Sequence, residues 1–198
     1  AQIEKHLENG VAFTCTDGIT ITRDVEIGAG TEILPGTIIR GKTKIGANCV
    51  IGPNCLIENC EIKDGVRLNY VQAYQSVIEA GVKIGPFVHI RPNSHIMSGV
   101  KIGDFVEIKN STIGENTAVA HLTYVGDSDV GKNINFGCGT VTTNYDGFKK
   151  FRCTIGDDAF IGCNTNLIAP VTVGNGSYIA AGSTITENVP AGSLAIAR

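Results

Sequence analysis

An aliphatic residue recurs at every sixth position along this chain, and few folds accommodate such a period. It holds over three separate runs: Ile27, Ile33, Ile39, Ile45, Ile51 and Ile57; Ile78, Ile84, Ile90, Ile96, Ile102 and Ile108; and Ile155, Ile161, Leu167, Val173, Ile179 and Ile185. An α-helix would repeat its apolar residues near every 3.6 positions, and one long strand at every second position. A period of six therefore predicts short strands joined by turns, which is the pattern of an all-β, parallel β-helix built from hexapeptide repeats.

The neighbours of each aliphatic residue agree with this prediction. A small or β-branched residue stands two positions before it, as at Thr31 and Cys49, and glycine often follows it, as at Gly46 and Gly85. In a triangular coil the aliphatic side chain fills the interior, the small residue fits near a corner, and glycine permits a turn at positive φ. Three hexads complete one coil, so residues 18 apart are expected to stack at roughly 4.8 Å.

The bulk composition excludes several classes of protein. The net charge is −3 and no run of Lys or Arg provides the basic patch of a nucleic-acid-binding protein. No apolar stretch is long enough for a membrane-spanning helix, and the polar N-terminus is unlike a secretory signal, so we expect a cytoplasmic protein without membrane insertion. The seven cysteines are odd in number and form no C-x-x-C pair, which favours reduced thiols.

The N-terminal segment falls outside the repeat. Residues 1–10 are expected to form a short helix that ends at Gly10, with His6 in contact with solvent. We interpret residues 1–16 as a linker helix that remains from a connection to a missing N-terminal domain. Residues 17–198 are then the β-helix domain.

The repeat breaks in two places. A step of ten residues separates Leu68 from Ile78, and after Val119 the next matching residues are Val130, Phe136, Thr142 and Ile155. The intervals of 11 and 13 residues in the second break predict loops extruded from the coil, with the sequences HLTYVGDSD and NYDGFKKFRC. Because loops on a rigid scaffold often carry function, the polar residues of these two segments are candidates for a site. They are His121, Tyr124, Asn144, Tyr145 and Lys150.

Two cations are predicted to stack just before the second break. Arg91 and Lys109 are 18 residues apart, and two positive charges so close repel unless an anion lies between them. A phosphate suits this position. Lys83 and Lys101 are also 18 apart, however, and such long side chains can simply extend into water. Stacking alone is therefore weak evidence, and the nearby break is what favours a phosphate site at Arg91 and Lys109.

Longer segments of the chain resemble a known family. HLTYVGDSDVGKNINFGCGTVTTNYDG, IGDDAFIGCNTNLIAPVTVG and YIAAGSTITENVPAGSLAIAR are similar to the C-terminal acetyltransferase domain of the bacterial bifunctional glucosamine-1-phosphate N-acetyltransferase / N-acetylglucosamine-1-phosphate uridyltransferases. The resemblance covers nearly the whole chain. It implies a left-handed β-helix, a homotrimer, acetyl-CoA bound between subunits, and acetylation of glucosamine 1-phosphate on the way to UDP-N-acetylglucosamine and peptidoglycan.

The resemblance also implies roles for individual residues. His121 would be the catalytic base, and the sugar phosphate would contact Arg91, Lys109, Tyr124 and Asn135. Acetyl-CoA would contact Cys138, Asn144, Tyr145, Cys163, Ala181 and Arg198. Cys138 and Cys163 replace the alanine and serine familiar in the family, and Asn93 replaces a glycine. The nucleotide loop of the uridyltransferase domain is absent, so acetylation without uridylation is expected, with no need for a metal.

The chemistry of acetyl transfer fits a histidine at this place. An amine attacks a thioester only when neutral, and an imidazole with a reference pKa near 6.5 can remove a proton from nitrogen at neutral pH. The oxyanion needs a fixed donor, for which a backbone N–H and the Tyr124 hydroxyl both remain open.

Three other functions are compatible with the repeat. A zinc hydratase of the γ-carbonic anhydrase kind needs three convergent histidines, whereas His89 and His95 are predicted on adjacent faces of the prism, pointing apart. A non-catalytic scaffold needs no such set of polar residues. Another hexapeptide-repeat acyltransferase, with a different amine or hydroxyl acceptor, remains the third alternative.

Overall fold

The computed structural model describes residues 2–197, which form one helix, α1 (Gln2–Glu8), and short parallel strands in three sheets. Sheet A contains β1 (Ala12–Phe13), β4 (Glu32–Ile33), β7 (Val50–Ile51), β10 (Arg67–Leu68), β13 (Lys83–Ile84), β16 (Lys101–Asp104), β19 (Ala118–His121), β22 (Asn135–Phe136), β25 (Phe160–Ile161), β28 (Tyr178–Ile179) and β30 (Leu194–Ala195). Sheet B contains β2 (Thr20–Ile21), β5 (Ile38–Arg40), β8 (Leu56–Glu58), β11 (Val71–Tyr74), β14 (Val88–Ile90), β17 (Glu107–Lys109), β20 (Tyr124–Gly126), β23 (Val141–Thr143), β26 (Asn166–Ile168) and β29 (Thr184–Ile185). Sheet C contains β3 (Glu26–Ile27), β6 (Lys44–Ile45), β9 (Glu61–Ile62), β12 (Val77–Ile78), β15 (His95–Ile96), β18 (Thr112–Ile113), β21 (Ser128–Val130), β24 (Cys153–Ile155) and β27 (Val171–Val173).

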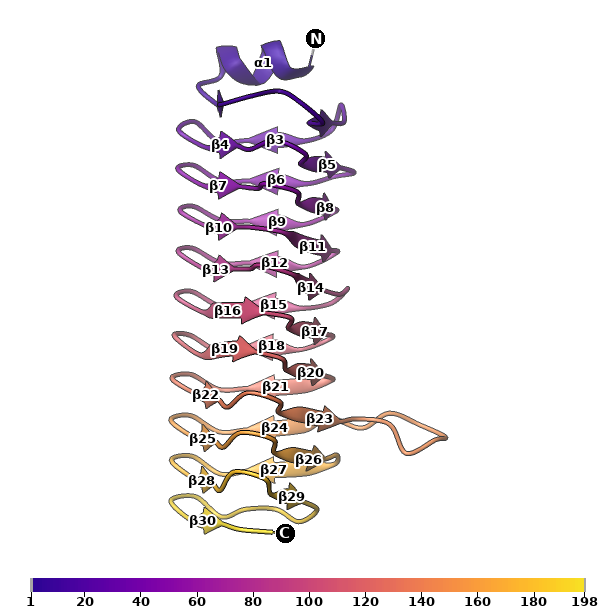
Figure 1. Cartoon of the computed structure of the whole chain (residues 1–198), viewed down its shortest axis with the longest axis vertical. Coiled ribbons are helices and arrows are strands. Elements are labelled where there is room, and N and C mark those ends of the chain that lie inside the picture. Colours follow the sequence, from indigo (N-terminus) through magenta and orange to yellow (C-terminus); the bar gives the residue numbers. More distant parts are fainter. Residues whose placement is uncertain (1, 198) are drawn as a thin grey trace.

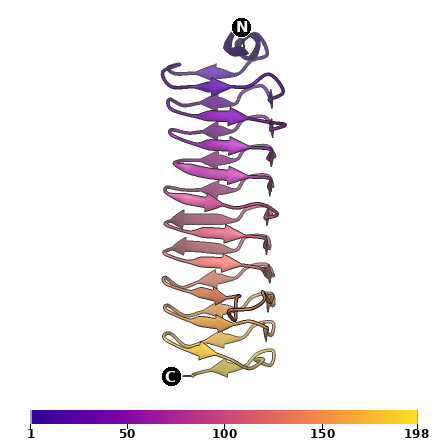
Figure 2. The same ribbon diagram turned by 90° about the vertical axis from the view of Figure 1, so that its right-hand side faces the viewer.

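The chain visits the three sheets in turn, so each coil of the prism contributes one strand to each sheet. In Figure 1 the nearer strands of sheet A run to the right and the fainter strands of sheet C return to the left as the chain descends from the N-terminus. The coil is therefore left-handed, and the view from the side shows the coils stacked in one straight column (Figure 2). The predicted left-handed parallel β-helix with a short N-terminal helix is confirmed. No helix among residues 2–197 has the length and apolar character needed to span a membrane.

The six-residue period places its aliphatic side chains inside the prism. Ile33, Ile51 and Ile90 are completely buried; Ile33 pairs in register with Ile51, and Ile90 with Ile108 of the next coil. Burying an isoleucine contributes about 1.5–3 kcal/mol, and each coil buries several. Thr31 shows why a small hydroxyl residue suits the corner: its Oγ1 donates to the carbonyl of Gly46 (2.8 Å) and accepts from the N–H of Cys49 (3.0 Å).

The cysteines of the coil serve packing. All seven are free, and burial raises the pKa of the Cys55, Cys60 and Cys153 thiols to about 11 against the backbone hydrogen bonds that lower it. A thiol with so high a pKa is a poor nucleophile at neutral pH. Cys49, Cys55, Cys60 and Cys153 are buried in the coil, so these four side chains contribute to its packing.

The loop predicted around HLTYVGDSD is wrong. Val125 lies inside the prism with no exposed surface, six residues after Val119 and five before Val130, so the coil continues through β19, β20 and β21. One side of the triangular coil can have five residues instead of six, and the coil still closes. Ile113, for example, pairs with Val130 of the next coil, 17 residues later instead of 18. The ten-residue step before Ile78 is likewise two sides of five with Ala73 buried between them. Counting only sixes misses such shorter sides.

The second predicted loop is present and forms a hairpin. Residues 144–151, here called the extruded hairpin, leave the coil after β23 and project from the column (Figure 1). Tyr145 and Lys150 form an antiparallel bridge, and the Asp146 carboxylate accepts hydrogen bonds from the N–H groups of Phe148 and Lys149 (both 2.8 Å). An aspartate bonded to the backbone two residues on fixes a tight turn.

Helix α1 covers the first coil. It ends before Gly10, whose φ of +81° permits the hydrogen bond from its N–H to the carbonyl of Leu7 (3.0 Å). The expectation that His6 contacts solvent is wrong, because only 1% of its surface is exposed. The helix turns this residue toward the end of the coil, and burial lowers the pKa of its imidazole.

Candidate active site

Two grooves flank the corner between sheets A and B. The A groove, of about 550 Å³, follows the outer face of sheet A and ends at Ala120 and His121. The B groove, of about 680 Å³, lies along sheet B and includes Glu107, Leu122 and Tyr124. The candidate residues at this corner thus lie beside concave surfaces of the size that small ligands occupy, about 300–1,000 Å³.

His121 is the last residue of β19 and lies on the corner itself. Its backbone is fixed, because it pairs with Asp104 of β16 and its carbonyl accepts a hydrogen bond from Thr123 Oγ1 (2.7 Å). Its imidazole is exposed and makes no hydrogen bond or ion pair with any residue of 2–197. A fixed backbone with a free imidazole leaves both ring nitrogens available to a ligand.

Arg91 and Lys109 lie at the C-terminal ends of their strands in sheet B, away from the His121 corner, and are stacked in successive coils as predicted. Ile90 pairs with Ile108, so the next residues along both strands are aligned. Each cation has a carboxylate partner: Arg91 Nη1 donates to Glu107 Oε1 (2.8 Å), and Lys109 Nζ donates to Asp127 Oδ2 (3.2 Å). The ion pair with Glu107 holds the pKa of Arg91 above its ordinary value, so this guanidinium stays charged.

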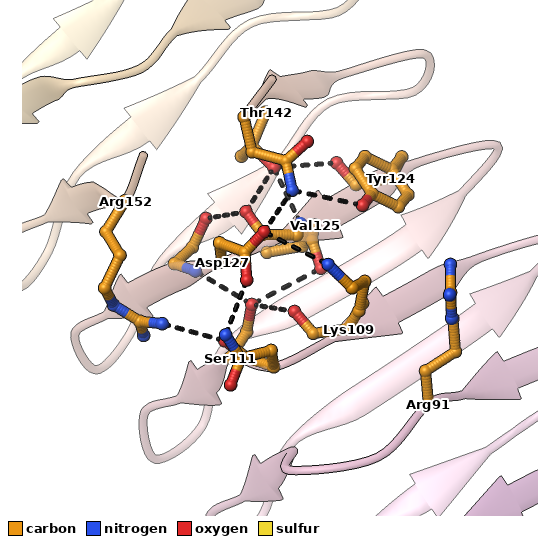
Figure 3. Close-up of polar contacts among 12 residues, drawn as sticks. Arg91, Lys109, Ser111, Tyr124, Val125, Asp127, Thr142 and Arg152 are labelled. Atoms are coloured by element: carbon orange, nitrogen blue, oxygen red, sulfur yellow. Dashed lines mark hydrogen bonds and ion pairs between the residues drawn. The ribbon is translucent and has the colours of Figure 1, made fainter. Parts of the chain in front are cut away.

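Asp127 connects the polar residues of this region (Figure 3). It is 5% exposed, and besides Lys109 its carboxylate accepts hydrogen bonds from Asn110 Nδ2 (2.5 Å) and from Asn144 Nδ2. Burial acts to raise the pKa of Asp127, but the three donors outweigh it and hold the pKa below its ordinary value. The group is therefore an anion that ties two coils and the extruded hairpin together.

Tyr124 enters the same network through Asn144. The amide of Asn144 donates to the Tyr124 hydroxyl oxygen (3.3 Å), and Asn144 is itself buried at the base of the extruded hairpin. The hydroxyl oxygen is thereby occupied as an acceptor, which leaves its own hydrogen free to be donated. Asn144, expected at the cofactor, lies beside the residues expected at the sugar phosphate.

Lys150 brings a further positive charge to Lys109. The contact with the Lys109 ammonium lowers the pKa of Lys150, and repulsion by Arg91 adds to this effect. The pKa of Lys109 is raised: burial acts to lower it, and the hydrogen bond and ion pair with the Asp127 carboxylate outweigh burial. Three cations from two strands and the hairpin therefore gather around one buried carboxylate, an arrangement that favours an added anion.

The residues expected at acetyl-CoA divide into three groups. Cys138, Cys163 and Ala181 occupy the A/B corner in successive coils, since the N–H of Asn164 donates to the carbonyl of Cys138 and the N–H of Gly182 to that of Cys163 (both 2.7 Å). Tyr145 is exposed on the extruded hairpin, where its hydroxyl donates to the carbonyl of Gly147 (2.6 Å). Arg198 lies outside the described residues.

Within one chain, Asn135 does not lie beside the other residues expected to bind the sugar phosphate. It is exposed at the start of β22 in sheet A, whereas Tyr124 and Lys109 lie on sheet B. His89 and His95 lie on different sheets, as expected, and His95 Nε2 is paired with Glu79 Oε1 (2.8 Å). Within residues 2–197 no three His, Cys, Asp or Glu side chains gather as metal ligands do.

The sequence matches the model of one protein family. The model described as bacterial transferase hexapeptide (six repeats) covers residues 24–59, 75–110 and 152–187. The chain belongs to this family. Its hexapeptide repeats are the coils described above.

Individual relatives of this chain extend the comparison. The bifunctional protein GlmU of Thermoanaerobacter pseudethanolicus is 60% identical over 98% of this chain and 42% of that protein, and the bifunctional protein GlmU of Clostridium botulinum (strain Kyoto / Type A2) is 55% identical over the same shares. The chain thus spans less than half the length of these relatives. The resemblance to the bifunctional enzymes is confirmed. A UDP-N-acetylglucosamine acyltransferase from Arabidopsis, 15% identical with a TM-score of 0.51 over 92% of this chain and 66% of that one, shares the fold.

Two acidic residues of the candidate site were not predicted from the sequence. Asp127 and Glu107 hold the two stacked cations, yet neither follows from the six-residue period. A usable signal was present for Asp127, because residues 109 and 127 are 18 apart and of opposite charge. Glu107 is only two residues from Lys109, and its partner Arg91 lies on the coil before, so register alone does not reveal that pair.

Proposed function

We propose that this chain transfers the acetyl group of acetyl-CoA to the amine of glucosamine 1-phosphate. The product, N-acetylglucosamine 1-phosphate, would supply UDP-N-acetylglucosamine for peptidoglycan and the cell wall. The observation that carries the proposal is the gathering of Arg91, Lys109 and Lys150 beside Tyr124, on the sheet that begins at the His121 corner. The identity of 60% to a bifunctional protein GlmU supports the same substrate class.

In this proposal the sugar phosphate binds among the three cations. A phosphate dianion competes with Glu107 and Asp127 for Arg91 and Lys109, and it relieves the repulsion that Lys150 meets from Lys109. Charge-assisted hydrogen bonds to phosphate are about twice as strong as neutral ones. Phosphate binding is therefore favoured both by these bonds and by the reduced repulsion among the three cations. Asn135 would complete the pocket from a neighbouring subunit, since its own chain places it on another face.

His121 acts as the general base of the proposed reaction. It takes a proton from the substrate nitrogen as the amine attacks the thioester carbonyl, and a positioned base of this kind contributes roughly 10²–10⁴-fold. The tetrahedral intermediate then breaks its C–S bond, and the proton held by the imidazole passes to the departing coenzyme A thiolate. The Tyr124 hydroxyl, whose oxygen already accepts from Asn144, has a hydrogen to donate to the oxyanion. No acyl-enzyme is needed, so Cys138 and Cys163 are not nucleophiles in this scheme.

Acetyl-CoA would lie along the A/B corner below His121. Cys138, Cys163 and Ala181 follow one another there in successive coils, and Tyr145 of the extruded hairpin would close the site from the side. Arg198 would contact the far end of the cofactor. A thioester is already an activated acyl donor, so the proposed transfer needs no metal.

A homotrimer completes the proposal, supported by the apolar ridge on the A/B corner. Tyr70, Phe87, Phe105 and Leu122 are 39–59% exposed and have φ between 46° and 57°. A left-handed conformation costs roughly 1–2 kcal/mol for such residues, and most other corners of the coil place glycine or asparagine there. Exposed apolar side chains at strained positions in four successive coils are typical of a subunit interface.

The remaining parts of the proposal concern setting and boundaries. We place the enzyme in the cytoplasm, in keeping with its seven free thiols, and assign it neither nucleic-acid partners nor membrane insertion. Residues 1–16 serve as a linker and residues 17–198 as the acetyltransferase domain. Uridyl transfer is not expected of this chain.

The release of coenzyme A thiol from acetyl-CoA tests this function directly. Glucosamine 1-phosphate should be acetylated far more efficiently than glucosamine, and Arg91→Ala should raise KM for the phosphorylated sugar with little change in kcat. An absence of preference for the phosphate, or an unchanged KM in the Arg91 variant, contradicts the proposal. A strong reaction with a different acceptor would assign the chain to another acyltransferase of the same fold.

A further inference from the structure

The charged residues on the outer faces of the coil follow a simple rule in all but one place. Where two charged residues pair in register on neighbouring strands, their signs are opposite, as for Arg40 with Glu58 and for Glu26 with Lys44. Opposite charges at this spacing attract, and like charges directly opposite each other are destabilising. Among the strand pairings of residues 2–197 the exception is the row formed by Arg67, Lys83 and Lys101, here called the cation ladder.

No carboxylate neutralises the cation ladder within the described chain. Arg67 pairs with Lys83, Lys83 pairs with Lys101, and the row is bounded by Val50 on one side and Ala118 on the other. All three cations are exposed, and none has an acidic partner among residues 2–197. Arg91 and Lys109, also adjacent, differ because each is held by its own carboxylate.

The cation ladder lines the A groove rather than a convex surface. The groove wall also includes the backbone turns at Gly52, Gly85 and Gly103, and no Asp or Glu lines it. Its one further ionisable group is His121, at the C-terminal end. A concave surface of about 550 Å³ with three unpaired cations and no anion concentrates positive potential along its length.

We propose that the A groove binds a linear di- or oligophosphate group along the cation ladder. The three cations are about 4.8 Å apart along the coil axis, so they address successive negative charges of an extended anion rather than one phosphate. The groove suits a small molecule of nucleotide size, and the acidic net charge of −3 disfavours a long nucleic acid. A bound oligophosphate would reach the His121 corner, where it would compete with acetyl transfer.

Calorimetric binding of inorganic tripolyphosphate and orthophosphate to the intact protein, at low salt, tests the proposal. Tripolyphosphate should bind at least about tenfold more tightly than orthophosphate, and Lys83→Gln should weaken it by about tenfold. Lys132→Gln is the matched control, because Lys132 is equally exposed but lies outside the groove. Equal affinity of wild type and Lys83→Gln, or no binding by the wild type, overturns the proposal.

A charge reversal keeps the test independent of folding defects. Lys83→Glu converts the row into alternating charges like those of Glu26, Lys44 and Glu61. We expect this variant to melt at a higher temperature than the wild type at low salt and to lose the stabilisation that tripolyphosphate gives the wild type. A lower melting temperature together with retained tripolyphosphate stabilisation overturns the proposal. A change of oligomeric mass with unaltered anion affinity would identify the cation ladder as a subunit contact instead, which also overturns it.

Enzyme kinetics distinguish whether the bound phosphates belong to coenzyme A or to a separate ligand. This experiment is the only one of the set that rests on the proposed acetyl transfer. If the ladder holds the diphosphate of coenzyme A, Lys83→Gln raises KM for acetyl-CoA by the same factor as it weakens tripolyphosphate. If it holds a separate ligand, KM for acetyl-CoA is unchanged and tripolyphosphate inhibits the wild type but not the variant. Because calorimetry needs no turnover, failure of the acetyl-transfer proposal leaves the binding test intact.

Discussion

The exposed imidazole of His121 stands out because the residue that carries it is so well fixed. Its carbonyl accepts from Thr123 Oγ1 and its strand pairs with β16, while the ring itself is free of partners among residues 2–197. In the proposed reaction this arrangement places the base at the A/B corner and leaves both ring nitrogens accessible to a substrate.

Replacing His121 by alanine should lower kcat for acetyl transfer by about 10²–10⁴-fold and leave the fold intact. Circular dichroism and melting temperature check the fold, and the thiol-release assay checks the rate. His95→Ala is the control, because His95 lies on sheet C in an ion pair with Glu79. Activity of His121→Ala close to the wild type would exclude this residue as the base.

The lowered pKa of Lys150 should make the proposed phosphate binding sensitive to alkaline pH. Lys109 beside it disfavours the charged form, so Lys150 loses its proton at a lower pH than an ordinary lysine, whose pKa is about 10.4. Affinity for glucosamine 1-phosphate should fall as the pH rises through this lowered pKa. In Lys150→Arg the guanidinium stays charged, so the rise of KM should move to higher pH. Identical pH profiles of KM in the two proteins would contradict this role.

At the scale of elements, the extruded hairpin is held at both ends by the coils beside it. Asn144 at its start donates to Asp127 and Tyr124. Just beyond its end, Arg152 donates to Asp129 (2.6 Å) and to the carbonyl of Asn110 (3.0 Å). The hairpin is thus an insertion with a clamped base, which keeps Lys150 next to Lys109 although residues 145–150 of the hairpin are exposed.

Asp127→Asn should release this clamp. Lys109, 17% exposed, loses its anion, and leaving a buried charged group unpaired costs about 1–3 kcal/mol of unfolding free energy at neutral pH. Since the folded pKa of Asp127 is lowered, its contribution is present above about pH 3.9 and fades as the pH falls through the folded value. Denaturation at several pH values and amide exchange over 144–151 measure both effects. A stability difference that does not shrink at acid pH would contradict the assignment.

The whole molecule is a straight column, and its apolar ridge runs along one edge. Tyr70, Phe87 and Phe105 stack from coil to coil with ring centroids 5.2 and 5.3 Å apart. The continuous edge across several coils suits a partner column that lies alongside, as a three-fold assembly of such prisms requires.

Phe105→Ser should therefore weaken the proposed trimer and shift the sedimenting mass from three chains toward one. Activity should fall with the mass, because Asn135 and the cofactor column of the proposed site lie on faces that only a neighbour brings together with Lys109. Leu7→Ser is the matched control, since Leu7 is comparably exposed on α1, away from the ridge. A stable trimer of Phe105→Ser with unchanged dissociation would remove the ridge as the interface.

The sequence alone determined the β-helix, its interior and the columns of its outer faces. A six-residue period reports burial, and burial in a coil fixes register, so Ile90 over Ile108 and hence Arg91 next to Lys109 follow from counting. The free cysteines and the extruded hairpin were also predictable, because each is a local property of the repeat or of its interruption.

Only the tertiary structure decided how the coil continues past Val119 and what surrounds the two cations. Val125 keeps the interior filled across a five-residue side, a compensation that depends on the neighbouring coils and not on the period. Asp127 collects donors from Lys109, Asn110 and Asn144, which lie up to 18 positions away, because parallel stacking brings distant segments within hydrogen-bonding distance. Periodicity encodes which side chains are buried, whereas polar partners are chosen by the contacts between coils once they have stacked.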